Sequence, residues 1–567
     1  MAAPVYALVL TLTVMAPLFS PGYLLLRDAV STPRSYLSDS ALGLSQAAPR
    51  AVPQDYAVAL ASALLDGGLV VKALLMISLW LAGWGAARLT AAVLPDAGIP
   101  GQWVAVTIAI WNPYVAERLL QGHWSLLVGY GCLPWVAASV LALRAGNGRG
   151  STGRELAPPP VWPLLFWIAL AGLTPTGLLL AAVIALATGL APGDGRSRTF
   201  CAVVSLAAAT TAALPWLVAA AVAGEWTETA NASGVTAFAA RAEPGLGTLG
   251  SLASLGGIWN AEAVPASRTT LFALVSAAAL LAIVAVGVPL LSRRRGAVPL
   301  LVVATAAIVG PTLMATGPGL ALLEAVTAAV PGLGVLRDSQ KWVALAVPAY
   351  TLAGAAAVIT LRPRIPAAAT AAVCCAALVT TMPDLAWGVG GRVSPVRYPV
   401  GWTIAAAVIN ADPRPVAVLP VDTMRRFEWA GDAPVLDPLP RWVRAEVFST
   451  GDLTVAGRTV LGEGSRAREI QRLLVSGADR GQLAAAGVGW VVVEGPDPGL
   501  ALPVSYRDDD ITVYFVGGQA PRAPHRTAML AAHAMWLGLL GCGLVGMVLS
   551  WLRRRPVQAA HKADTNP

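Results

Sequence analysis

The stretch GGLVVKALLMISLWLAGWGAA, residues 67–87, decides the fold class of this sequence. It is 21 residues long and carries a single charged side chain, Lys72. About 20 mostly apolar residues are enough for an α-helix to cross the hydrocarbon core of a bilayer. The stretch therefore predicts a membrane-spanning helix.

The composition extends this prediction to the whole chain. Of the 567 residues, 56% are hydrophobic and 12% are charged, and the mean hydropathy is +0.65. A typical soluble domain has about twice that share of charged residues, so the chain has too few polar side chains to coat several soluble domains. The formal net charge of +8 is then best explained by membrane topology, and no nucleic-acid partner is expected.

Further apolar runs bring the expected total to about 12 membrane passes. The stretch 162–191 is interrupted by Thr174-Pro175-Thr176-Gly177, so it is either one kinked helix or a hairpin of two short helices. The hairpin keeps the triple-arginine runs 293–295 and 553–555 in the cytoplasm, as the positive-inside rule requires. We therefore favour it, with both termini cytoplasmic. The other runs lie at 5–26, 67–87, 99–111, 124–143, 201–223, 269–291, 298–316, 342–361, 366–382 and 527–551.

The expected fold is an α-helical polytopic membrane protein with a small extracytoplasmic α/β domain before the last helix. Strand-like runs at Val416–Val421, Trp490–Val493 and Ile511–Val516, and an amphipathic helix near Arg466–Val475, predict that domain. The expected parts are a polytopic domain at 1–382, the α/β domain at 383–526, a transmembrane helix at 527–552 and a basic cytoplasmic tail at 553–567. The segments expected on the outer face are 27–66, 112–123, 224–268, 317–341 and 383–526.

Ionisable residues gather at the expected outer ends of the helices and are nearly absent from the middle of the spans. Transporters usually need such residues near the midplane, whereas an enzyme acting on a lipid headgroup needs them at the interface. Asp28, next to Arg27 after the first run, could act there as a general base, or the pair could simply end a helix in water. Lys72 is a weaker candidate of the same kind.

The segment WNPYVAERLLQGHW, residues 111–124, combines an acid, an arginine and a histidine between aromatic residues. If it is helical, Tyr114 and Arg118 share one face, whereas Glu117 points to another. Arg118 or His123 could bind a phosphate, and Trp124 could stack on a sugar ring. The alternative is an ordinary interfacial aromatic belt.

The segment LRDSQKW, residues 336–342, places two cations on the side where the positive-inside rule expects few. Arg337 and Lys341 are four residues apart and share a face if the next helix extends outward. Together they suit a lipid phosphate. The alternative is snorkelling at a helix end, with Asp338 as a local partner.

These strings resemble the GT-C superfamily of membrane glycosyltransferases, which use polyprenyl-phosphate sugars. The Asp after the first helix, the many passes and the outer C-terminal domain carry the resemblance to the superfamily. Within it, YfhO-like and actinobacterial arabinofuranosyltransferase-like members have segments similar to Asn112-Pro113-Tyr114 through Gln121-Gly122-His123-Trp124, to the 337–342 string and to Gly487–Val493. Many GT-C enzymes have paired acids in the first loop, whereas here Arg27 precedes Asp28. No cofactor is expected, and divalent metal dependence is left open.

The resemblance implies inverting transfer of an arabinofuranosyl or mannosyl group at the outer face of the plasma membrane. A polyprenyl-phosphate-linked sugar would be the donor, and a cell-envelope glycan or glycolipid the acceptor. Asp28 would be the base, and the donor phosphate would lie near Arg337, Lys341, Arg118 and His123. Two other functions stay open, a lipid-linked sugar flippase and a non-catalytic envelope assembly protein. The residues expected around the substrate are Arg27, Tyr114, Glu117, Trp124, Asp338, Gln340 and Lys72.

Overall fold

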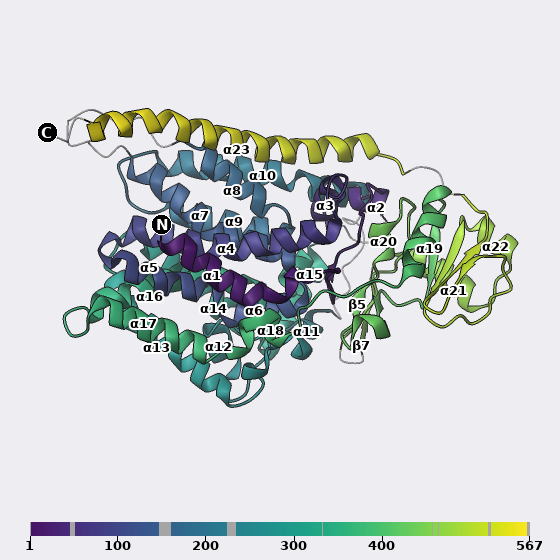
Figure 1. The fold of residues 1–567 in the computed structure, drawn as a ribbon, viewed down its shortest axis with the longest axis horizontal. Helices are drawn as coiled ribbons and strands as arrows, with labels where there is room; N and C mark the ends of the chain where they lie inside the picture. The colour runs from purple at the N-terminus through teal and green to yellow at the C-terminus, as the bar shows by residue number, and fades with distance from the viewer. Residues whose placement is uncertain are drawn as a thin grey trace.

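The computed structural model describes residues 2–45, 51–146, 160–223, 234–330, 333–455, 458–462, 464–519 and 523–563. These residues form a body of packed helices and, beyond one end of it, a smaller α/β unit (Figure 1). Residues 224–233 of the expected outer segment 224–268 and residues 564–567 of the expected tail lie outside the described residues.

Long apolar helices build the body, because hydrocarbon offers no partner for backbone N–H and C=O groups and a helix satisfies them internally. They are α1 (Ala2–Met15), α4 (Gly67–Val93), α5 (Gly98–Ile110), α7 (Trp124–Ala145), α8 (Trp162–Ala171), α9 (Pro175–Gly189), α10 (Arg198–Ala223), α13 (Phe272–Leu291), α14 (Val298–Met314), α15 (Gly317–Ala329), α16 (Val347–Leu361), α17 (Ala367–Thr380) and α23 (Arg526–Ala563).

Within the described part of the chain, seven helices are long and apolar enough to cross a membrane, or nine if each of two bent pairs is one span. The helices α8 and α9, with 10 and 15 residues, fall short of a crossing on their own. The total of about 12 passes therefore stays a prediction.

Two element boundaries differ from the sequence-based expectation. The first run ends early: α1 stops at Met15 and a 3₁₀ turn, η1 (Ala16–Phe19), follows it, because proline and glycine occur repeatedly between 17 and 22. The chain after α14, for which no helix was predicted, forms α15, bent by 94° from α14. Thr316 starts this new helix, since its hydroxyl accepts a hydrogen bond from the Gly319 amide at 3.2 Å.

The chain reverses direction between α8 and α9, as the favoured hairpin reading requires. Trp167 of α8 stacks on Trp135 of α7, with ring centroids 4.8 Å apart, as α8 runs back toward Gly129. Gly177, at the start of α9, packs against Gly129, and the chain just after α9 accepts a hydrogen bond from Arg144. Thus α9 runs parallel to α7, and α8 runs against it.

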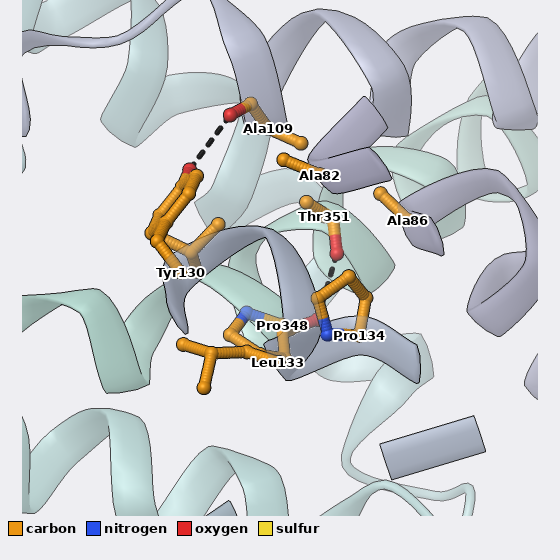
Figure 2. Close-up of a pocket in the computed structure, with 9 residues that line it drawn as sticks. Ala82, Ala86, Ala109, Tyr130, Leu133, Pro134, Pro348 and Thr351 are labelled. Carbon is orange, nitrogen blue, oxygen red and sulfur yellow. Dashed lines mark hydrogen bonds between the residues drawn. The ribbon is translucent and has the colours of Figure 1, made fainter. Parts of the chain in front are cut away.

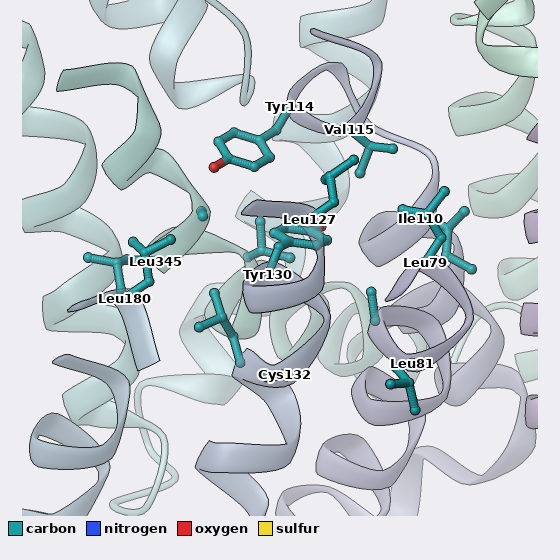
Figure 3. Packing of buried hydrophobic residues seen from close by; sticks show 14 of the residues in the cluster. Leu79, Leu81, Ile110, Tyr114, Val115, Leu127, Tyr130, Cys132, Leu180 and Leu345 are labelled. Carbon is teal, nitrogen blue, oxygen red and sulfur yellow. The ribbon is translucent and has the colours of Figure 1, made fainter. Parts of the chain in front are cut away.

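The hydrophobic core of the body lies around α4, α5, α7 and α16. Figure 3 shows part of it, with Leu79 of α4, Ile110 of α5 and Leu127 of α7. In the most apolar 18-residue window of Ser339–Leu361, 89% of the residues are buried, whereas in that of α23 only 11% are. Helix α23 is therefore peripheral, and it packs mainly on α8 and α10. A small apolar pocket lies between these central helices (Figure 2). Its polar groups are satisfied, because Tyr130 donates to the Ala109 carbonyl and Thr351 donates to the Pro348 carbonyl. The pocket is lined by Ala82, Ala86, Ala109, Tyr130, Leu133, Pro134, Val347, Pro348 and Thr351.

All five expected outer segments meet at one end of the body. Residues 27–28 contact α6 (Pro113–Gln121), Glu262 and Pro434, and Asp338 also contacts α6. At the opposite end, loops are joined by contacts such as the ion pair between Asp96 and Arg294. The structure therefore groups the loops as the sequence predicted.

The α/β unit is built on a four-stranded sheet of order β3-β8-β10-β9, in which β3 and β8 are parallel and the other pairs are antiparallel. Alternate strand residues pack against α19 on one face and against α21 and α22 on the other. The predicted strands and helix are present, with ends shifted by no more than two residues. The bounds are α19 (Val400–Ala411), β3 (Val416–Leu419), β4 (Met424–Arg425), β5 (Val435–Leu436), α20 (Leu439–Trp442), β6 (Leu453–Val455), β7 (Arg458–Val460), α21 (Ser465–Val475), α22 (Arg480–Ala485), β8 (Trp490–Glu494), β9 (Val504–Arg507) and β10 (Ile511–Phe515).

Candidate active site

A tight hairpin carries Asp28 at its tip. Strands β1 (Leu25–Leu26) and β2 (Ala29–Val30) pair antiparallel, with Arg27 and Asp28 as the two turn residues. Two-residue hairpin turns favour positive φ angles and hence Gly, Asn or Asp, yet Arg27 has a φ of 49°. Strained backbone of this kind persists only where surrounding contacts hold it, and it is common at functional sites.

Helix α6 ends against this hairpin because of its capping residues. Asn112 caps the start, accepting from the Val115 amide at 3.0 Å, and Gly122 ends the helix with a φ of 81°. A Cβ atom at Gly122 would lie 2.3 Å from the backbone nitrogen of Ala29. Only glycine fits there. Because Gly122 has no side chain, the hairpin packs directly on its two neighbours in the sequence, Gln121 and His123.

Asp28 accepts hydrogen bonds from these two flanking residues. Its Oδ2 lies 2.9 Å from His123 Nε2 and 3.1 Å from Gln121 Nε2, and Asn260 in turn donates to Gln121 Oε1 at 2.8 Å. Burial raises the pKa of the Asp28 carboxyl, but the interaction with His123, the hydrogen bond from Gln121 and the charge of Lys341 outweigh this and lower it below its ordinary value. The side chain is still 41% exposed, so an ionised oxygen is open to a ligand.

His123 links Asp28 to a buried ion pair. Arg118 Nη1 lies 3.0 Å from His123 Nδ1 and 3.1 Å from Asp338 Oδ2. Because a guanidinium only donates, Nδ1 of His123 accepts and the ring proton sits on Nε2, facing Asp28. Burial lowers the pKa of His123, and the charges of Lys341 and Arg118 add to this, which agrees with a neutral imidazole.

Asp338 is the second acid of this cluster. Lys341 Nζ lies 3.5 Å from the same Asp338 oxygen that Arg118 contacts. Burial raises the pKa of Asp338, but the charges of Arg118 and Lys341 lower it overall to about 2. The residues Asp28, His123, Arg118, Asp338 and Lys341 form one continuous chain of polar contacts, which we call the site cluster.

Tyr114 and Arg118 share one face of α6 and Glu117 lies on another, as the sequence predicted. Tyr114 lies beside Arg118, with the guanidinium carbon 5.2 Å from the ring centroid, and donates to the Lys341 carbonyl. Glu117 points the other way and is fully buried. Its carboxylate accepts from two backbone amides at 257–258 and from Gln340 Nε2 at 2.9 Å. Burial, with the nearby charge of Glu243, raises the pKa of Glu117. Glu117 and Gln340 thus hold loops together beneath the site cluster.

Arg337 and Lys341 do not share a helix face, because the segment forms two 3₁₀ helices, η5 (Leu333–Leu336) and η6 (Ser339–Ala346), with a break between them. Lys341 turns toward Asp338, whereas Arg337 donates to the Gly334 carbonyl and lies 5.9 Å from the ring centroid of Phe238. The spacing argument assumed an α-helix and does not apply here.

Three further candidates lie in the frame around the site cluster. Lys72 donates to the Ser20 carbonyl at 2.8 Å, at the end of the first helical segment. Trp124 is packed in the hydrophobic core and is 3% exposed. Arg27 is buried and donates to the Leu120 carbonyl at 2.7 Å.

Sequence reasoning missed Gln121 as a partner of Asp28 and Asn260 as a partner of Gln121. The Gln-Gly-His order could have suggested Gln121, since a glycine at such a position predicts a helix end; no local signal indicates Asn260. Among the residues that the structure describes, no three His, Cys, Asp or Glu side chains are placed to hold a metal ion. We name no metal ligand.

Comparison with known proteins gives the fold a counterpart. No protein-family model matches the chain, and no curated protein matches it. Among solved structures, the chain is similar to the cryo-EM structure of arabinofuranosyltransferase AftD from Mycobacteria, with a TM-score of 0.57 and 16% sequence identity over 91% of this chain. The chain spans 40% of the length of that protein. The similarity establishes that the two proteins share a fold over 91% of this chain.

Proposed function

We propose that this protein is a GT-C-type glycosyltransferase of cell-envelope synthesis that takes its sugar from a polyprenyl phosphate. The observation that carries the proposal is the site cluster. In it, a half-exposed, ionised Asp28 contacts His123, which contacts the buried Arg118, and the charge of Lys341 is close by. It lies at the helix ends, where the headgroup of a lipid donor would be. The fold shared with an arabinofuranosyltransferase supports the same reading.

In the proposed reaction, an acceptor hydroxyl gives its proton to Asp28 while its oxygen attacks the anomeric carbon of the donor sugar. The bond from that carbon to the phosphate oxygen breaks, and polyprenyl phosphate leaves with the electron pair, so the configuration inverts. The lowered pKa of Asp28 keeps it ionised at neutral pH, which a base must be. An arabinofuranosyl or mannosyl group is the sugar we propose.

We assign the donor phosphate first to Lys341, whose side chain is 25% exposed next to Asp338. Arg118 is fully buried and His123 is hydrogen-bonded to Asp28, so we propose that these two orient the base. Arg337 faces Phe238 and remains a proposed second phosphate contact. The proposed orientation puts the site cluster and the α/β unit outside the plasma membrane and both termini in the cytoplasm.

The test is sugar transfer by the full chain in lipid bilayers, using radiolabelled polyprenyl-phosphate arabinofuranose and mannose with envelope-glycan acceptors. Removing a positioned base costs about 10²–10⁴-fold in rate, so Asp28→Asn should lose transfer by that factor while folding normally. Asp96→Asn, in the exposed ion pair at the opposite end of the body, is the matched control and should transfer like the wild type. Full activity in Asp28→Asn would refute the assignment.

A further inference from the structure

We propose that the α/β unit positions the base, by adding strand β5 to the hairpin that carries Asp28, and that Arg27 is the positioning residue of this joint. The inference rests on the proposed function of Asp28. It gives the α/β unit a task in the chemical step itself, whereas a separate glycan-binding module would act only on the acceptor.

The main chain of Arg27 is shared between the helical body and the α/β unit. Its N–H donates to the Pro434 carbonyl and its carbonyl accepts from the Leu436 amide, both at 2.9 Å, so Arg27 pairs with Val435 in a parallel bridge. This is β-strand addition, in which main-chain hydrogen bonds supply the attachment. The residue after this bridge is Asp28.

A second bridge holds the other end of the same hairpin. Tyr23 and Val396 exchange both main-chain hydrogen bonds, at 2.7 and 2.9 Å, and Tyr398 donates to the Ser31 carbonyl at 3.0 Å. The hairpin is therefore clamped before its first strand and at its tip by chain segments that lead into and belong to the α/β unit.

The side chain of Arg27 fixes the tip from the opposite side. It is 3% exposed, and it donates to the Leu120 carbonyl at the end of α6 at 2.7 Å and to the Glu262 carbonyl at 3.2 Å. These contacts hold Arg27 at its positive φ, a conformation that is unfavourable for a non-glycine residue unless its surroundings compensate. Because the conformation of Arg27 is fixed, the carboxylate of the next residue, Asp28, stays in contact with His123 and Gln121.

Strand β5 is in turn tied to the centre of the α/β unit. Arg425 of the paired strand β4 donates to Glu494 of β8 at 2.6 Å and lies 3.7 Å from Asp437, and all three side chains are buried. A buried charge cluster resists partial displacement, because separating one partner leaves an uncompensated charge. A shift of the sheet would thus reach Asp28 through β4 and β5.

The test compares Leu436→Pro, which removes the N–H donated to Arg27, with Arg27→Gly, which keeps the positive φ but loses the guanidinium. Arg426→Gly, at an exposed arginine of the same β4–β5 hairpin, is the control. Amide hydrogen exchange of residues 23–31 should accelerate in both test variants and not in the control. Misplacing a catalytic group by about 1 Å can cost 10²-fold, so kcat should fall by about that factor while the KM for donor stays unchanged.

Two results would overturn the inference. Unchanged exchange at residues 23–31 in both test variants would show that no clamp exists, and faster exchange with wild-type kcat would show that the clamp does not serve catalysis. Hydrogen exchange does not depend on activity, so either failure is separate from a failure of the proposed function, which Asp28→Asn decides. If Leu436→Pro does not fold, Arg27→Gly carries the test alone.

Discussion

Removing the charge of Asp338 should destabilise the protein by an amount that the site cluster predicts. Asp338→Asn removes the only carboxylate that Arg118 contacts among the described residues, while Arg118 remains fully buried. Two of its guanidinium nitrogens, Nε and Nη2, already make no hydrogen bond within the described structure. The variant therefore leaves a buried, poorly solvated cation.

Two routes give similar magnitudes. The pKa of Asp338 falls from an ordinary value of 3.8 to about 2 in the folded protein, and a shift of this size corresponds to about 2.5 kcal/mol of stability at neutral pH. Breaking a buried ion pair by removing one partner costs about 3–5 kcal/mol. We expect the free energy of unfolding to drop by about 2.5–5 kcal/mol at pH 7.

Unfolding in mixed micelles, followed by circular dichroism, measures this difference as a function of pH. Because folding depresses the pKa of Asp338, its contribution is complete above about pH 4 and is lost as pH falls toward 2. The difference between wild type and variant should shrink over that window. Asp96→Asn breaks an exposed ion pair with Arg294, so it should lower the free energy of unfolding by no more than about 1 kcal/mol. A difference that is absent at pH 7, or equally large at pH 2.5, would refute the reasoning.

Three further predictions address the remaining parts of the site. Lys341→Ala should weaken binding of a fluorescent polyprenyl-phosphate donor, and Arg337→Ala should weaken it less; unchanged affinity in both would remove the phosphate assignment. The pKa values of Asp28 and His123 are both lowered, so kcat/KM should stay level as the pH falls through 6.5, the ordinary value for histidine, and should drop only at more acidic pH; an inflection near pH 6.5 would contradict a neutral His123. Gly122→Ala should lower the thermal midpoint and abolish transfer, because its Cβ would meet the hairpin backbone; Gly391→Ala has a similar φ with open space around it, and an equal effect there would contradict the steric argument.

The sequence predicted most of what depends on local pattern. Apolar runs of spanning length became helices, the interrupted stretch 162–191 became two helices of opposite direction, and the i,i+4 spacing placed Tyr114 beside Arg118. Strand β9 was missed because its pattern is only four residues long and its residues are largely exposed at the sheet edge.

The arrangement of the candidate site was less accessible, since it depends on contacts between distant segments. Asp28 and His123 are 95 positions apart, and nothing in either segment specifies their hydrogen bond. The pairing of Arg118 with Asp338 crosses 220 positions. The expected pairing of Arg337 with Lys341 assumed α-helical geometry, whereas the 3₁₀ geometry of η6 brings Lys341 toward Asp338, three residues away.

The route of the chain into and out of the α/β unit has a mechanical consequence. The chain enters after α17 and leaves into α23, and these helices run along opposite edges of the body (Figure 1). The unit is thus joined to the body by two covalent connections. A single cut near Gly391, before α19, would leave only the connection to α23. The two fragments could still be held together by the main-chain bridges between Tyr23 and Val396 and between Arg27 and Val435.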